Sequence, residues 1–318
     1  MKIQLIGNFE LLICAKCDIM IDSTVANCEK SSEISPIKVY PDYGLDVGHT
    51  EKNMLDKLIA LAKEAGALTL GADVGSHFKS KGRHADFVTE YDLRTQEYIV
   101  NALSARYPGY GLLCEEKGVN RASVNGYCFI IDPIDGTTNF MHGSSEYAVC
   151  IGLAKAGEPI LGVVHLPAAG ITYFAERGHG AFAEKDGKAV RITVSRSGLD
   201  NALIAVGTSP YYPELSRLSL EIVKKSILRA ADIRRSGSAA IDICRTAEGV
   251  YDIMYEPLLC PWDYTAAGAV LLEAGGTLTD IHGAPIDCMK KSGIVAANPK
   301  ASAEFIENIK DLTAADKL

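Results

Sequence analysis

Apolar residues in the first part of the chain recur at two spacings, helical in some segments and alternating in others. Residues 54–70 carry apolar side chains at helical spacing in MLDKLIALAKEAGALTL, which predicts an amphipathic helix. Residues 86–108 predict a short extended segment and then a second helix, with Asp92 as its N-cap and Pro108 just beyond its end.

From residue 110 onward the chain shows first a series of strand patterns and then alternating strand and helix patterns. Strands are expected at 110–116, 127–132, 146–155 and 159–167, followed by a glycine-rich hairpin region at 171–190. Strands and helices then alternate, with strands at 201–208, 231–236, 250–256, 277–280 and 293–298, and helices at 214–228, 238–249, 261–276 and from about 302 onward. This alternation predicts an α/β half that follows a mixed, helix-flanked sheet.

Three regions follow from these patterns. Residues 1–53 contain little helix or strand periodicity and read as an N-terminal extension. Residues 54–195 form the predicted α+β half, and residues 196–318 the α/β half that completes the active site. One hypothesis for the extension is that Met54 is the true start of the protein.

Composition narrows the class of protein. The chain has 318 residues, 47% apolar and 23% charged, which suits one large domain or two packed halves. No window approaches the roughly 18 continuous apolar residues of a membrane span, and no signal peptide is expected. The net charge is −8 with no dense Lys/Arg block, so direct contact with nucleic acid is not expected.

Nine cysteines are an odd number, and those after residue 100 mostly lie in apolar surroundings. This usage predicts buried free thiols and a reducing, cytoplasmic location. The CAKC sequence at residues 14–17 has redox or half-zinc spacing, but no second ligand pair follows it, so a structural role is favoured.

Three acidic clusters follow strands or open helices: Glu115 with Glu116, Asp132 with Asp135, and Asp263. Carboxylates gathered at strand ends repel one another unless a cation lies between them, and oxygen ligands without His or Cys favour Mg²⁺. After Asp135, Gly136 permits a phosphate to approach the amides at the start of a helix. The alternative for either aspartate alone is a turn or a helix cap.

At these residues the chain resembles a known family. The segments EE, DPIDGTTNF and WDYTAAGAVLLEAGG are similar to the three signatures of the inositol monophosphatase family, the lithium-sensitive, Mg²⁺-dependent sugar and nucleotide phosphatases. The resemblance spans roughly residues 54–310, and Cys114 stands where the first signature usually has glycine. It implies a layered α-β-α-β-α sandwich of the sugar phosphatase type.

The resemblance also implies a set of metal ligands. A first ion would be held by Glu115, Asp132 and the carbonyl of Ile134, and a second by Asp132, Asp135 and Asp263. A third, weaker ion would bind Glu115 and water, which gives two to three Mg²⁺ ions.

The same resemblance assigns residues to catalysis and to the substrate. Thr137 and Asp92 would orient the attacking water in a direct hydrolysis, beside the metal ligand Glu115. The substrate-binding residues would be Lys81, Asp135, Gly136, Thr137, Ala239, Glu256 and Asp263. Among these, Ala239 would offer a backbone amide, Glu256 would accept hydroxyl groups, and Lys81 would belong to a loop that closes on the site. Arg234 and Arg235 can face either a partner subunit or the substrate phosphate.

The first functional hypothesis is therefore a phosphatase of inositol monophosphate or a related phosphorylated polyol or sugar. Fructose-1,6-bisphosphatase, or dual specificity, is the second. A transcription-associated interaction protein is an alternative of another class, because some bacterial relatives associate with the transcription machinery. The family implies a homodimer.

Overall fold

The computed structural model describes residues 11–13, 20–22, 52–72, 78–82, 87–117, 119–123 and 125–314. The chain divides into two units, residues 1–48 and 49–318. In the first, strands β1 (Leu11–Ile13) and β2 (Met20–Asp22) pair antiparallel. The two cysteines of the CAKC sequence lie outside the described residues. No helix among the described residues is long and apolar enough to cross a bilayer.

The second unit contains seven α-helices in its described part. They are α1 (Lys52–Ala67), α2 (Glu90–Arg106), α3 (Thr137–Met141), α4 (Pro213–Ser226), α5 (Ala239–Ala247), α6 (Pro261–Glu273) and α7 (Pro299–Ile309), with a short 3₁₀ turn at Leu199–Asn201. The strands are β3 (Phe78–Ser80), β4 (Phe87–Thr89), β5 (Gly111–Cys114), β6 (Tyr127–Asp135), β7 (Ala148–Lys155), β8 (Glu158–Leu166), β9 (Ile171–Glu176), β10 (Gly180–Lys185), β11 (Lys188–Ile192), β12 (Leu203–Val206), β13 (Asp232–Arg234), β14 (Ile253–Leu259), β15 (Thr277–Thr279) and β16 (Ser292–Ala297).

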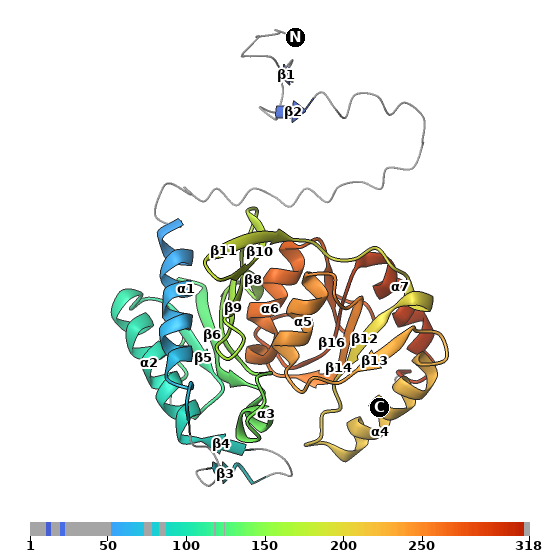
Figure 1. Ribbon diagram of the computed structural model, residues 1–318, viewed down its shortest axis with the longest axis horizontal. Coiled ribbons are helices and arrows are strands. Elements are labelled where there is room, and N and C mark those ends of the chain that lie inside the picture. Colours follow the sequence, from blue (N-terminus) through green and yellow to red (C-terminus); the bar gives the residue numbers. More distant parts are fainter. Residues whose placement is uncertain are drawn as a thin grey trace. The chain divides into compact units, whose positions relative to one another are not determined.

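Two larger sheets and three pairs of helices alternate in this unit. Helices α1 and α2 cover one face of the seven-stranded sheet, α5 and α6 lie between the two sheets, and α4 and α7 cover the far face of the five-stranded sheet (Figure 1). The predicted layered α-β-α-β-α sandwich is confirmed. A separate hairpin, β3–β4, precedes α2.

Strand directions differ between the two sheets. The first has the order β11-β10-β9-β8-β7-β6-β5, in which only β5 and β6 run parallel. The second has the order β13-β12-β14-β16-β15, and its parallel part is β13-β12-β14. Parallel strands end at a common edge, so residues that follow β12, β13 and β14 emerge together.

Three buried clusters fill the spaces between these layers. The central cluster contains α5 and α6, and two glycines let α6 approach the first sheet closely. A Cβ at Gly162 would lie 2.0 Å from the carbonyl oxygen of Ala266, and one at Gly152 would lie 3.0 Å from Thr265 Cγ2. Since α6 carries Asp263 at its start, this close packing fixes one ligand candidate against the sheet.

Three predicted helix boundaries need correction. Asp92 is not the N-cap of α2: Thr89 is, and Asp92 is the third helical residue, whose carboxylate accepts a 2.8 Å hydrogen bond from the Thr89 amide in a capping box. The last helix begins at Pro299, three residues earlier than expected, because Asn298 caps it. The first helix begins at Lys52 rather than at Met54.

A chain that starts at Met54 should fold and retain activity. The buried face of α1 begins at Leu58, and every predicted site residue lies further along. We expect a midpoint of thermal unfolding within about 2 °C of the full chain, since the truncation removes only Lys52 and Asn53 from α1. Thermal unfolding monitored by circular dichroism, with a phosphatase assay, checks this.

A second truncation that starts at Leu68 is the control. It removes α1, including the buried Leu61 and Ala65, and exposes the remainder of that cluster, which includes Ile99 and Phe129, so it should not fold. Aggregation or inactivity of the Met54 truncation, with a sound full chain, would contradict the proposed boundary.

Candidate active site

An irregularity in β6 brings its two aspartates to one side. Residues three apart in a regular strand point to opposite faces of the sheet. Here Asp132 pairs with Cys150 and Asp135 with Ala148, so the register shifts by one residue between the two aspartates. This bulge places an extra residue at Pro133–Ile134, and both carboxylates then reach the same site.

Asp263 joins this pair from the second half of the chain. It lies in the first turn of α6, where Pro261 occupies the start, and its carboxylate accepts a 2.6 Å hydrogen bond from the Cys260 amide. One carboxylate oxygen from each of Asp132, Asp135 and Asp263 lies within 4.8 Å of the others. The structure thus gathers three of the predicted metal ligands in one place.

Glu115 lies beside this group and contacts Lys81. It follows β5 directly, and β5 runs parallel to β6 with Cys114 opposite Ile131. Its carboxylate accepts a 2.8 Å hydrogen bond from the Lys81 ammonium, which also lies 2.5 Å from a carboxylate oxygen of Glu116. The charge of Glu115 raises the pKa of Asp132, so the two side chains interact.

Burial and mutual repulsion raise the pKa values of these carboxyl groups. Burial is the largest cause in each case, and it places the pKa of Asp135 at about 7 and those of Asp132 and Asp263 well above the usual range. The neighbouring negative charges raise the values further. Removing water from carboxylates this close together is unfavourable unless a cation replaces the lost hydration.

The residues present fit a hard divalent cation. The donors gathered here are carboxylate oxygens, with no His in the group, which is the chemistry that Mg²⁺ prefers over zinc. Cys150 lies opposite Asp132 in the sheet, but it is fully buried and burial raises the pKa of its thiol. The donor set therefore favours Mg²⁺.

Thr137 links the cluster to Asp92. Its hydroxyl lies 3.2 Å from a carboxylate oxygen of Asp92 and 3.1 Å from the carbonyl oxygen of Ile134, so it can donate to either. The other carboxylate oxygen of Asp92 is held by Thr89. Burial raises the pKa of Asp92 to about 6. The structure brings the predicted Thr–Asp pair together, and Asp92 supports the helix end as well.

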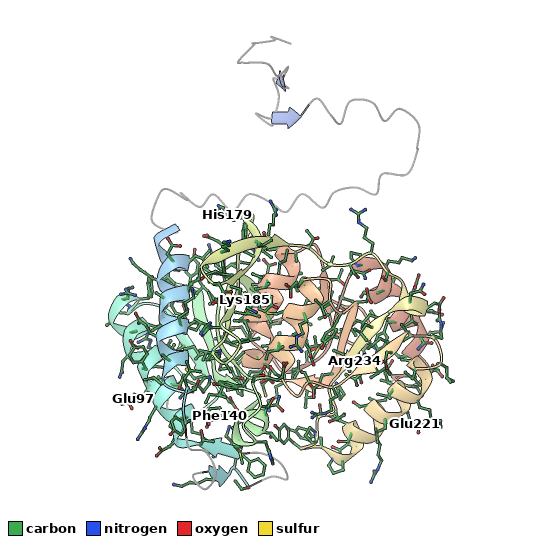
Figure 2. All side chains as sticks on the ribbon, in the orientation of Figure 1. Glu97, Phe140, His179, Lys185, Glu221 and Arg234 are labelled. Carbon is green, nitrogen blue, oxygen red and sulfur yellow. The ribbon has the colours of Figure 1, made fainter. Side chains whose placement is uncertain are left out.

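Gly136 forms the turn that leads into α3. Its φ of 91° lies in the left-handed region, and a Cβ there would be 3.0 Å from the carbonyl oxygen of Glu146. Phe140 of α3, labelled in Figure 2, packs with Ile134 and Tyr147 and anchors the turn. The turn therefore needs glycine for both its backbone angle and its close packing.

The start of α5 closes the site opposite this turn. The N-cap of α5, Ser238, donates its hydroxyl to Asp135, and the amide of Ala240 donates to the same carboxylate oxygen at 2.9 Å. Ala239 is buried between them. Its predicted role of offering an amide to a substrate hydroxyl stays a prediction.

Glu256 lies within β14, one residue beyond Tyr255, the last β14 residue that pairs with β12. Its Oε1 accepts a 2.9 Å hydrogen bond from the Ser209 amide and one from the Ser209 hydroxyl. A Cβ at Gly207 would lie 2.0 Å from its Oε2, so the carboxylate lies directly over that glycine. Burial raises the pKa of Glu256, and the nearby guanidinium of Arg235 lowers it.

The sequence interpretation missed Ser238 and Asp242 as parts of this site. Ser238 had a recognisable signal, because serine before an apolar helical run is a common N-cap. Asp242 is only 3% exposed, and its Oδ1 has no hydrogen-bond partner among the described residues. Nothing in the spacing of IDICRTAEG indicated that this helical aspartate would be buried beside Asp135.

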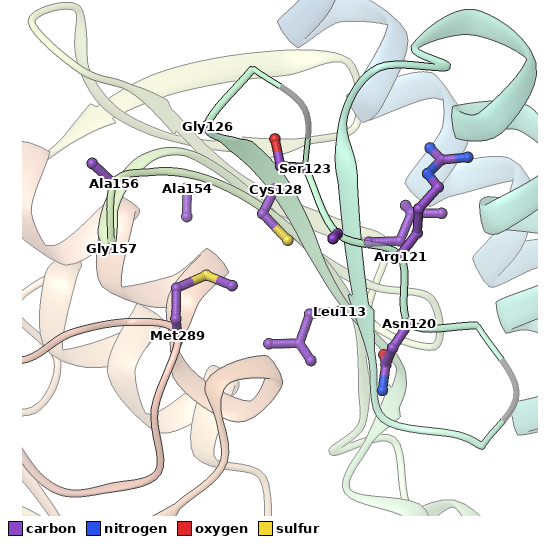
Figure 3. Close-up of a pocket in the computed structure, with 12 residues that line it drawn as sticks. Leu113, Asn120, Arg121, Ser123, Gly126, Cys128, Ala154, Ala156, Gly157 and Met289 are labelled. Carbon is purple, nitrogen blue, oxygen red and sulfur yellow. The ribbon is translucent and has the colours of Figure 1, made fainter.

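A cavity of about 360 Å³ lies elsewhere and is lined by none of the predicted site residues (Figure 3). Its wall is mostly apolar and includes Leu113, Cys128, Ala154 and Met289. Arg121 also borders it, but the guanidinium donates to the carbonyl of Tyr110. The carboxylate cluster, rather than this cavity, carries groups suited to catalysis.

Comparison with known proteins identifies the family. The sequence matches the inositol monophosphatase family over residues 51–314. The chain belongs to this family. A protein of Neisseria meningitidis serogroup B named putative Nus factor SuhB is 36% identical over 225 residues, which cover 70% of this chain and 84% of that protein.

Two further relatives of this inositol monophosphatase family member are informative. The fructose-1,6-bisphosphatase/inositol-1-monophosphatase of Aquifex aeolicus is 35% identical over 254 residues, 77% of this chain and 91% of that one. The crystal structure of the extragenic suppressor protein suhB of Bartonella henselae has a TM-score of 0.74 at 32% identity and covers 83% of this chain and 99% of that chain. The family consists of metal-dependent phosphoric monoester hydrolases, so the predicted family and enzyme class are confirmed.

The raised pKa values predict how stability depends on pH when metal is removed. Between the usual carboxyl pKa and the raised native value, the folded protein binds more protons than the unfolded chain, so its stability rises as pH falls. We expect the metal-free protein to be more stable at pH 6 than at pH 8, and Asp132→Asn to stabilise it at pH 8 by on the order of 1–3 kcal/mol. Denaturant unfolding in EDTA measures both effects.

Asp56→Asn, on the exposed face of α1, is the matched control. It should change neither the stability of the metal-free protein at pH 8 nor the difference in stability between pH 6 and pH 8. Magnesium should stabilise the wild type at pH 8, since a ligand that binds only the folded state does so. If the metal-free protein becomes less stable as the pH is lowered from 8 to 6, the crowded carboxylates do not repel one another as described.

Proposed function

We propose that this protein is a Mg²⁺-dependent phosphomonoesterase that hydrolyses inositol monophosphate or a related polyol or sugar phosphate. The observation that carries the proposal is the gathering of Asp132, Asp135 and Asp263 within 4.8 Å, with Glu115 beside them. The hydrogen-bonded pair of Thr137 and Asp92 lies at the same place. Family membership supports the reaction class.

Glu115, Asp132, Asp135, Asp263 and the carbonyl of Ile134 would hold two ions, and Glu115 a third. When bound, Mg²⁺ would supply charge neutralisation for the phosphoryl group and a lowered pKa for a coordinated water. These residues converge from β6, α6 and the end of β5, so packing of both halves of the chain fixes their positions.

Thr137 and Asp92 would position the attacking water. The Thr137 hydroxyl can accept a hydrogen bond from water while it donates its own proton toward Asp92, 3.2 Å away. Asp92, with a pKa of about 6, is ionised at neutral pH and can accept this proton. Water then attacks phosphorus directly as it gives up a proton through Thr137 toward Asp92, the P–O ester bond breaks, and the leaving alkoxide takes a proton from solvent water to form the alcohol.

The remaining predicted residues would bind the substrate. The amides of Gly136 and Thr137 face the phosphoryl oxygens, and Glu256 accepts hydrogen bonds from hydroxyl groups of the polyol through Oε2, since Ser209 occupies Oε1. Lys81, now paired with Glu115 and Glu116, would act from the β3–β4 hairpin. Six cysteines of the described residues are free thiols, five of them buried, which is consistent with the proposed cytoplasmic location.

Family resemblance supports two further properties, inhibition by lithium and a homodimeric assembly. The Aquifex aeolicus relative is named for both fructose-1,6-bisphosphatase and inositol-1-monophosphatase activity, which keeps fructose-1,6-bisphosphate as a second candidate substrate. Assays with both compounds distinguish single from dual specificity.

Activity should require Mg²⁺ and the shared carboxylate. We expect Asp132→Asn to lower kcat by at least about a hundredfold, because this side chain would serve two ions and loses its charge. Steady-state hydrolysis of inositol monophosphate with and without EDTA is the measurement. Full activity in EDTA, or an Asp132→Asn protein as fast as the wild type, would contradict the proposal.

A second candidate function is association with the transcription machinery, favoured by the relative named putative Nus factor SuhB. An Asp263→Asn variant separates the two roles, because it removes a proposed metal ligand without altering the outer surface. If the protein binds transcription factors, capture of RNA polymerase or its accessory factors from extract should survive this substitution. Failure of wild type and variant alike to capture any of them would dismiss this candidate.

A further inference from the structure

Two adjacent arginines follow the parallel strands of the second sheet, and their surroundings differ. Arg234, labelled in Figure 2, ends β13, and its guanidinium lies 2.5 Å from a carboxylate oxygen of Asp232. Arg235 donates through Nε to the hydroxyl of Thr208 at 3.2 Å. Within the described part of the chain, no carboxylate lies within the 4.0 Å that defines an ion pair with Arg235.

The topology directs Arg235 to the site. In the parallel part of this sheet, Ala205 pairs with Arg234 and Val206 with Tyr255. The residues that come next, Thr208, Arg235 and Glu256, therefore emerge at the same edge. Both the hydrogen bond to Thr208 and the effect of Arg235 on the pKa of Glu256 agree with this placement.

The backbone beside Arg235 is held against the catalytic turn. The side-chain amide of Asn139, in α3, donates to the carbonyl of Ser236 at 2.9 Å and to that of Glu146 at 2.7 Å. Two residues later, Ser238 binds Asp135. Arg235 thus lies on a segment that is fixed to both α3 and the carboxylate cluster, although its own side chain is exposed.

The cations around the site have different partners. Among the described residues, Lys81 pairs with Glu115 and Glu116, Arg245 pairs with Glu146, and Lys291 contacts the Cys260 side chain beside Asp263. Arg235 uses Nε for Thr208, which leaves its two terminal nitrogens available. A guanidinium presents these donors in a planar fork that matches phosphate and carboxylate groups.

We propose that Arg235 binds an anionic group at the non-reacting end of the substrate, so that the site accepts sugar bisphosphates as well as inositol monophosphate. This inference rests on the proposed phosphatase function. Glu256 and Arg235 then select different substrate groups at the edge of the site: the carboxylate favours hydroxyl groups, and the guanidinium favours a second phosphate. The ratio of the two activities depends on both residues.

The test compares kcat/KM for inositol 1-phosphate and fructose 1,6-bisphosphate in five proteins: wild type, Arg235→Ala, Arg235→Lys, Arg234→Ala and Glu256→Gln. In Arg235→Ala, loss of a charged hydrogen bond should lower kcat/KM for fructose 1,6-bisphosphate by about 10- to 100-fold, mainly through a higher KM. The kcat/KM for inositol 1-phosphate should change by less than about threefold. Arg235→Lys should lower kcat/KM for the bisphosphate by less, since lysine keeps the positive charge but lacks the planar pair of guanidinium donors.

The neighbouring variants supply the contrast. Arg234→Ala is the matched control, because Arg234 pairs with Asp232 and both side chains are exposed. It should change kcat/KM for neither substrate. Glu256→Gln should act in the opposite sense, lowering inositol phosphate turnover by about tenfold and leaving bisphosphate hydrolysis unchanged or raised. In the wild type, added salt should raise KM more for the bisphosphate, and Arg235→Ala should remove this difference.

Several results would overturn the inference. Equal losses on both substrates in Arg235→Ala would place the residue at the reacting phosphate, and a changed molecular mass by light scattering would place it at a subunit interface. Wild-type hydrolysis of inositol phosphate without any bisphosphate hydrolysis would refute this inference and leave the proposed function intact. Hydrolysis of neither substrate would refute the proposed function itself.

Discussion

Repulsion among buried carboxylates is the constraint on which this site depends. Asp132, Asp135 and Asp263 would be held apart by their charges, yet the bulge in β6 and the packing of α6 against the first sheet bring them together. The raised pKa values express the resulting free-energy cost. A divalent cation removes that cost, so the same geometry that destabilises the metal-free protein creates affinity for metal.

The two halves of the chain contribute different parts of the chemistry. The first sheet supplies Asp132 and Asp135 and the turn at Gly136, and the second sheet supplies Glu256 within β14 and Arg235 directly after β13. Helices α5 and α6 lie between the sheets, and Ser238 and Asp263 extend from their starts into the site. The layered architecture thus brings the proposed metal ligands and the proposed substrate-selecting residues to the same place.

Much of this arrangement was predictable from the sequence because it follows local patterns. Alternation of strand and helix predicted the α/β half, the family resemblance implied the five layers, and the acidic clusters with Asp132 and Asp135 indicated a cation site. The N-cap of α2 was assigned wrongly because Asp92 was read alone, whereas Thr89 and Asp92 together form a capping box. The burial of Asp242 and the different environments of Arg234 and Arg235 depend on contacts between segments far apart in sequence, which local periodicity does not encode.

The central claim is that the crowded carboxylates form a divalent-metal site. Anomalous diffraction from crystals of the protein grown with Mn²⁺, a redox-stable substitute for Mg²⁺ with oxygen-ligand preference, tests it most directly. The account predicts anomalous density between Asp132, Asp135 and Asp263, with the carbonyl of Ile134 and Glu115 in coordination. Well-ordered carboxylates with no anomalous density among them at saturating Mn²⁺ would contradict it.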